Sequence, residues 1–110
     1  MFDKLLVVIV SADEKAVVGA RMASRMVQRG TLADVRVLFF GPSERLLAEP
    51  PAAIADALAT LPASAPPMAC RAVATELGMA DRLQAAGLEL VQAGQEVERR
   101  MLDGYQVMTF

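Results

Sequence analysis

The sequence predicts an α/β protein, a three-layer α/β/α sandwich around a five-stranded, mainly parallel sheet. Short apolar runs rich in β-branched residues alternate five times with stretches of helical spacing. Strands that are apolar on both sides and joined by helices form parallel sheets with helices on both faces. The chain has 110 residues, 55% of them hydrophobic, which suits a single domain over residues 1–110.

The first strand and helix are predicted within residues 5–29. Residues 5–10 are a short, continuous apolar run, typical of a buried strand. Residues 11–13 supply side-chain oxygens that cap a helix over residues 14–29, and Gly30 ends it. Two stripes run along this helix: an apolar one predicted to pack in the core, Val18, Met22 and Met26, and a basic one predicted to face solvent, Arg21, Arg25 and Arg29.

The middle of the chain continues the alternation. Residues 35–40 are predicted as a second buried strand, followed by a Gly-Pro-Ser turn and a short helix over residues 43–48. Two prolines then break the chain, and residues 62–67 form a proline-rich connector. Between them, one helical face is predicted from three apolar positions: Ile54, Leu58 and Leu61.

The last part of the chain holds three more strands. They are predicted at residues 68–69, 88–92 and 105–110, with helices from Cys70 to Gly78, over residues 80–86 and over residues 95–103. In the last helix, Val97 and Met101 are expected to point inward. Four charged residues of that helix are expected on its surface: Glu96, Glu98, Arg99 and Arg100.

Composition argues against several classes of function. The net charge is −2, no basic tract is present, and the aromatic residues are one tyrosine and four phenylalanines, so we expect no nucleic-acid partner. The apolar runs are too short to span a bilayer, and no cleavage-site pattern follows the first, so we expect a cytoplasmic protein. One cysteine and no histidine predict no metal site, no cofactor and no internal disulfide.

Three loops are predicted to meet at one edge of the sheet, because ligands of open α/β sheets bind outside the carboxyl ends of the strands. The candidate catalytic residue there is Cys70, at the start of a helix. The N–H groups and dipole of a helix N-terminus stabilise a thiolate relative to a thiol. The other pocket candidates are Ser11, Asp13, Gly41, Ser43 and Arg71.

Each candidate also has a purely structural explanation. A free cysteine often packs as a small hydrophobic residue, which would leave Cys70 unreactive. Helix capping accounts for Ser11 and Asp13. The turn from Gly41 to Ser43 could form an anion-binding nest, but a turn with proline at the first helical position explains it equally well.

Four segments of the chain resemble the DsrE/DsrF-like family. They are KLLVVIVSADEKAVVGARMASRM, ADVRVLFFGPSERLL, ACRAVATELGM and LELVQAGQEVERRMLDGYQVMTF. The resemblance covers nearly the whole chain, and it implies a small α/β sandwich that assembles into homo-oligomers, trimers or hexamers. In sulfur-relay members a cysteine at this position carries a persulfide and passes its sulfur to a partner protein, and Cys70 is the residue that matches it.

Two functions from different classes follow. The first is a sulfur carrier, or persulfide sulfurtransferase, with sulfur-donor and sulfur-acceptor proteins as partners and the transferred sulfur held on Cys70. The alternative is a non-catalytic homo-oligomeric module that binds a small anionic ligand or a partner at the strand edge, with Cys70 packed structurally. A flavodoxin-like mononucleotide binder is the weaker third hypothesis, because the first turn lacks a run of hydroxyl residues and the chain has no tryptophan.

Overall fold

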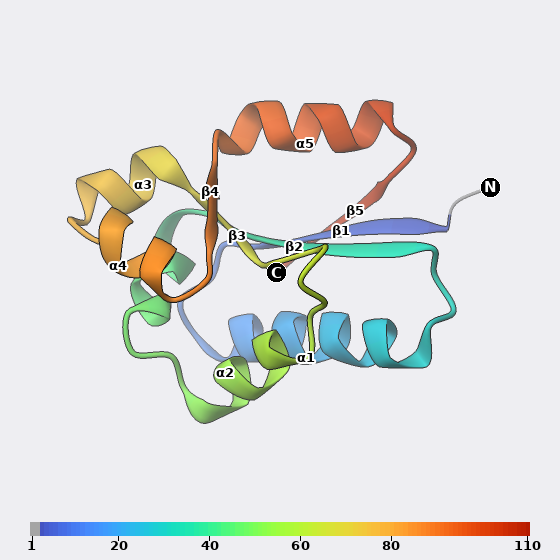
Figure 1. Ribbon diagram of the computed structural model, residues 1–110, viewed down its shortest axis with the longest axis horizontal. Helices are drawn as coiled ribbons and strands as arrows, with labels where there is room; N and C mark the ends of the chain where they lie inside the picture. Colours follow the sequence, from blue (N-terminus) through green and yellow to red (C-terminus); the bar gives the residue numbers. More distant parts are fainter. Residues whose placement is uncertain (1–2) are drawn as a thin grey trace.

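The computed structural model describes residues 3–110, which form one five-stranded sheet between layers of helices (Figure 1). The strand order is β4-β3-β2-β1-β5, and all four pairings are parallel, so the predicted α/β sandwich is confirmed. In chain order the elements are β1 (Lys4–Ile9), α1 (Glu14–Arg29), β2 (Asp34–Phe39), the 3₁₀ helix η1 (Gly41–Leu47), α2 (Ala52–Ala59), β3 (Met68–Cys70), α3 (Arg71–Glu76), α4 (Ala80–Ala85), β4 (Glu89–Val91), α5 (Ala93–Leu102) and β5 (Gln106–Thr109).

Strand β1 lies between β2 and β5 and is buried on both faces. Its side chains alternate between two apolar clusters, because successive residues of a strand point to opposite sides. Leu5, Val7 and Ile9 join the cluster that contains residues of α1 and α2, and Leu6 and Val8 join the cluster beneath α5. This double burial explains why the strand is an unbroken apolar run.

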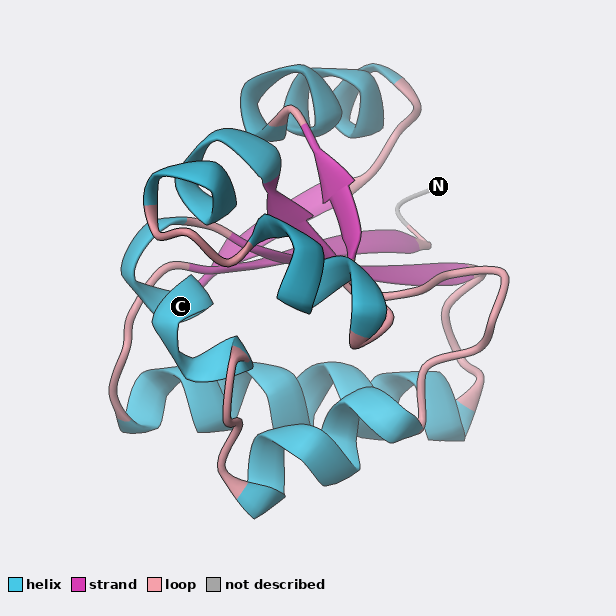
Figure 2. Cartoon of the chain, turned by 60° about the vertical axis from the view of Figure 1, so that its left-hand side comes forward, coloured by secondary structure: helices cyan, strands magenta, loops and turns pink. Residues whose placement is uncertain are grey.

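Right-handed connections explain which face each helix covers. The chain moves one strand at a time from β1 to β4, and then returns across the sheet to place β5 beside β1. Right-handed connections that run in opposite directions lie on opposite faces of a sheet. Accordingly, α1 and α2 cover one face and α5 covers the other, with the strands between them (Figures 1 and 2).

Helix α1 has the predicted bounds, but its buried face differs from the prediction. Asp13 caps it by accepting a hydrogen bond from the Lys15 N–H (3.0 Å), and Gly30 ends it in the left-handed conformation. Met26 packs against the core, whereas Val18 is 56% exposed and the prediction for it is wrong. The buried face consists instead of small residues that let the helix lie close to its neighbours: Ala16, Gly19, Ala20, Ala23 and Ser24.

The predicted inner face of α5 is also partly wrong. Val97 packs against the second apolar cluster, but Met101 is 58% exposed. Glu96 and Arg100, expected on the surface, are buried and form an ion pair of 2.7 Å between Glu96 Oε2 and Arg100 Nε. The inner face of this helix is therefore partly ionic.

This ion pair belongs to a polar network that connects α5 to β2. Arg100 Nη1 donates to the Tyr105 hydroxyl (3.2 Å), which in turn donates to the Asp34 carboxylate. Asp34 also accepts a hydrogen bond of 2.7 Å from Arg36 Nε. Burial opposes ionisation of Asp34, but the hydrogen bonds from Arg36 and Tyr105 outweigh it and hold the pKa of this carboxyl below its usual range.

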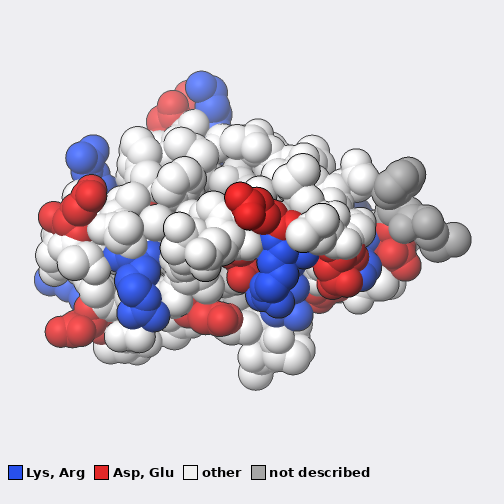
Figure 3. Space-filling model, turned by 90° about the horizontal axis from the view of Figure 1, so that it is seen from above, with Lys and Arg blue, Asp and Glu red and all other residues white. Residues whose placement is uncertain are grey.

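The helices described for residues 3–110 include none that is long and apolar enough to cross a membrane. On the face that α5 covers, acidic and basic side chains are interspersed with uncharged surface (Figure 3).

Candidate functional site

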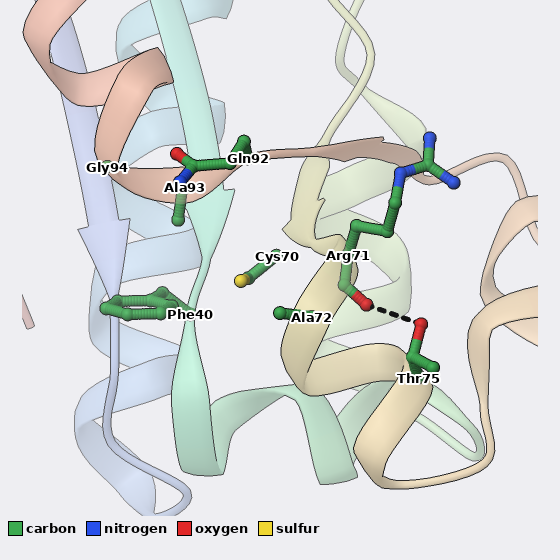
Figure 4. Close-up of a pocket in the computed structure, with 8 residues that line it drawn as sticks. All are labelled: Phe40, Cys70, Arg71, Ala72, Thr75, Gln92, Ala93 and Gly94. Carbon is green, nitrogen blue, oxygen red and sulfur yellow. Dashed lines mark hydrogen bonds between the residues drawn. The ribbon is translucent and has the colours of Figure 1, made fainter.

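A pocket opens between the first turns of α3 and α5, where β3 and β4 end (Figure 4). The chain goes outward from β3 to its neighbour β4 and then back across the sheet to β5, so the direction of winding reverses at this pair of strands. Open α/β sheets bind ligands at such reversals. The volume of about 600 Å³ is that of a small-molecule site. Its lining residues are Phe40, Cys70, Arg71, Ala72, Thr75, Gln92, Ala93 and Gly94.

Cys70 is the last residue of β3, immediately before α3, whereas the sequence predicts it one step later, at the start of the helix. The residue is only 5% exposed, yet its sulfur is directed into the pocket rather than along the axis of α3 (Figure 4). The thiol makes no capping hydrogen bond to α3, which is only six residues long. The sulfur therefore faces the pocket.

The immediate surroundings of the sulfur are apolar. The Phe40 ring and the methyl groups of Ala72 and Ala93 surround the space into which the sulfur points (Figure 4). Phe40 is a large apolar side chain that remains 41% exposed, and it lies between β2 and η1. The sulfur therefore points into an apolar part of the pocket.

The polar side chains of the pocket are engaged in structural hydrogen bonds. Arg71 Nη2 donates to the Leu90 carbonyl (3.2 Å), and its guanidinium points away from Cys70 (Figure 4). Thr75 Oγ1 donates to the Arg71 carbonyl (2.8 Å) within α3. Arg71 therefore connects α3 to β4, and its charge is not directed at the sulfur.

The first turn of α5 forms the opposite wall. Gln92 caps this helix, because its side-chain oxygen accepts a hydrogen bond from the Gln95 N–H (2.7 Å). Ala93 and Gly94 follow in the first turn, where backbone N–H groups have no partner within the helix and favour negative charge. The helix N-terminus opposite the sulfur is thus that of α5. The sequence did not predict that this helix is part of the site.

A buried carboxyl group lies behind Cys70. Glu44, in η1, is fully buried, and its Oε2 accepts a hydrogen bond from the Gly41 N–H (3.1 Å). Its Oε1 has no hydrogen-bond partner. Burial raises the pKa of Glu44 to about 7, against the opposing effect of the Gly41 and Cys70 backbone N–H groups.

Sequence reasoning missed Glu44. A glutamate in a short helix is usually exposed, and the one available signal was its position three residues after the turn glycine, where a carboxylate can accept a backbone N–H. In the same turn, Ser43 is fully buried and its hydroxyl donates to the Ile9 carbonyl, which secures η1 to the end of β1.

Of the six predicted site residues, the structure brings Cys70 and Arg71 into one pocket. Gly41 lines a separate surface hollow, with a φ of 80°. Asp13 caps α1, and neither Asp13 nor Ser11 borders the Cys70 pocket. No cluster of three or more metal-ligating side chains occurs within residues 3–110.

Comparison with known proteins shows a protein of the same fold but names no activity. No protein-family model matches the chain, and no curated protein does. The chain is similar to the solved structure of BT1422, a conserved protein of unknown function from Bacteroides thetaiotaomicron. The TM-score is 0.81 at 18% sequence identity, and the match covers 98% of this chain and 95% of that one. A likeness at this identity establishes a shared fold.

Proposed function

We propose that the protein is a sulfur carrier that holds a persulfide on Cys70 and passes its outer sulfur to a cysteine of a partner protein. The observation that carries this proposal is that the sulfur of Cys70 is directed into an open pocket at the carboxyl edge of the sheet. The resemblance of the cysteine–helix junction to DsrE/DsrF-like sulfur-relay proteins supports it further.

The reaction is thiol exchange and conserves electrons at each step. The Cys70 thiolate attacks the outer sulfur of a donor persulfide R–S–SH, giving Cys70–S–SH and releasing R–S⁻. The thiolate of an acceptor A then attacks the outer sulfur of Cys70–S–SH, giving A–S–SH and restoring Cys70–S⁻. The unpaired N–H groups in the first turn of α5 favour the negative charge of the bound species. Neither step requires a metal ion or a histidine.

A second candidate function has an observation in its favour. Cys70 is 5% exposed and belongs to the apolar cluster beneath α5, together with Leu6, Val8 and Met68. A cysteine that only packs there leaves the pocket free to act as a binding site for a small anionic ligand or a partner.

Intact-mass spectrometry separates the two functions. Native protein is incubated with a low-molecular-weight persulfide, beside a Cys70→Ser variant and a urea-unfolded sample. The carrier gains one sulfur, about 32 Da, when it is native, loses it on reduction, and shows no gain in Cys70→Ser. Gain only in the unfolded sample would reject the carrier and leave the binding module.

The proposal includes assembly into a homo-oligomer. All four residues of the edge strand β5 are exposed, including Val107 (37%) and Met108 (40%), and nearby Leu102 is 90% exposed. A second copy that covers these side chains would remove apolar surface from water. Light scattering on the wild type and a Leu102→Glu variant tests this, and a monomer for both proteins contradicts it.

A further inference from the structure

The carboxyl group of Glu44 has an unusual environment for a charged side chain. It is fully buried beneath the junction of β3 and α3, it accepts one hydrogen bond, from the Gly41 N–H, and its Oε1 is unpartnered. Buried polar atoms without a partner are rare in native proteins, and a catalytic role is one of the explanations for them. The η1 helix packs against both β3 and α3, so Glu44 lies near the backbone of Cys70, whose N–H favours the ionised carboxylate.

Among residues 3–110, no charged side chain pairs with Glu44 to compensate a negative charge on it. In η1 itself, Arg45 is exposed. On α3, which packs against η1, Glu76 is exposed, and the guanidinium of Arg71 is bound to the Leu90 carbonyl of β4. On the side of β1, Ser43 contributes only a neutral hydroxyl group. The groups that favour its ionised form are two backbone N–H groups, those of Gly41 and Cys70, so ionised Glu44 is a poorly compensated charge close to the backbone of Cys70.

We propose that Glu44 is a positioning residue for Cys70, which acts through the β3–α3 junction so that its protonated form permits reaction of the thiol and its ionised form slows it. A negative charge in a low-dielectric site disfavours a second negative charge close to it. Ionised Glu44 also attracts the Cys70 N–H, which holds the junction, and the attraction weakens when the carboxyl is neutral. This inference rests on the proposed function only in taking Cys70 as the reacting group.

The rate of alkylation of native Cys70 by iodoacetamide, measured from pH 5.5 to 8.5, tests the inference. The variant Glu44→Gln keeps the shape of the side chain and cannot ionise. We expect its rate to match the wild type at pH 6 and to exceed it by about tenfold at pH 8, where the wild-type carboxyl is ionised. Glu76→Gln, on the exposed side of α3, is the matched control and should follow the wild type throughout.

A constant ratio of the two rates across the pH range overturns the inference, since a merely structural role of Glu44 would change the rate equally at every pH. If Glu44→Gln does not fold, the dependence of the wild-type alkylation rate on pH decides. Two inflections in this curve support the inference, and a single inflection overturns it. If native protein takes up a persulfide sulfur but the ratio of the two alkylation rates is constant with pH, the role of Glu44 is rejected and the sulfur-carrier function stands. If the ratio of the two alkylation rates changes with pH but native protein takes up no persulfide sulfur, the sulfur-carrier function is rejected and the role of Glu44 stands.

Discussion

The burial of Glu44 predicts an unusual dependence of stability on pH. Its pKa is 4.5 in the unfolded chain and about 7 in the folded protein. The folded state therefore binds more protons between these two values, and the free energy of unfolding falls as the pH rises through them. This loss of stability is complete at pH values above the pKa of the folded state, and it is absent at pH values well below the pKa of the unfolded state.

The expected size of the effect follows from the same two values. Ionising Glu44 in the folded protein costs about 3 kcal/mol relative to the unfolded chain, and most of this cost develops between pH 5 and pH 8. The chain has no histidine, so few other side chains titrate in this window. Glu44→Gln removes the titrating group and should give a nearly constant stability across it.

Urea unfolding followed by far-UV circular dichroism at pH 5, 6, 7 and 8 measures this difference. Contributions from groups that the two proteins share cancel when the variant is subtracted from the wild type. The side-chain amide that Glu44→Gln introduces should accept the Gly41 N–H as the carboxylate does, so the absolute stability at pH 5 should change little. Parallel pH profiles for the two proteins would refute the argument, because a solvated carboxylate has no reason to titrate near neutrality.

Three further predictions concern packing and the buried network. Glu96→Gln should lower the free energy of unfolding by about 3 kcal/mol at pH 7, because it leaves Arg100 buried without its partner. Burial opposes ionisation of Glu96, but hydrogen bonds from the arginines outweigh this effect and lower the pKa of Glu96, so the stability that it contributes is lost as the pH falls below about 4.5. In urea titrations, the difference in free energy of unfolding between the wild type and Glu96→Gln should therefore be smaller at pH 3.5 than at pH 7. An equal difference at the two pH values contradicts this prediction. Tyr105→Phe should cost about 2 kcal/mol in the same assay, since its hydroxyl bonds two charged groups, and a cost below about 0.5 kcal/mol would show that the network is dispensable. Gly19→Ala would place a Cβ 2.9 Å from the Phe110 ring and should cost about 1–3 kcal/mol; combining it with Phe110→Ala should recover most of that cost, and simple additivity would contradict the clash.

The elements with strong local signals were predicted closely. The bounds of α1 match because Asp13 and Gly30 fix both ends of the helix through local hydrogen bonding and backbone conformation. The sheet was predicted as five-stranded and mainly parallel because short apolar runs alternate with helical stretches along the chain. Strand order could not be predicted, because no local sequence feature indicates that β5 pairs with β1.

The candidate site was predicted only in part, for a related reason. The position of Cys70 at a strand end follows from the chain itself. The opposite wall of its pocket comes from α5, and that contact depends on β3 and β4 being neighbours. The inner face of α5 was predicted one residue out of phase, on Met101 instead of Arg100, because an arginine is expected inside only when partners such as Glu96 and Tyr105 are known.

The pairing of β1 with β5 has a consequence for the order of folding. Each of the strands β1 to β4 pairs with the strand that follows it in the chain, so these four can assemble sequentially, whereas β5 pairs with the first strand from the opposite end of the chain. Contacts of such long sequence separation form slowly. Until they form, one side of β1 is an unpaired edge of consecutive apolar residues, which is a template for pairing with another chain. We therefore expect the protein to be most vulnerable to aggregation in the interval before its last strand docks.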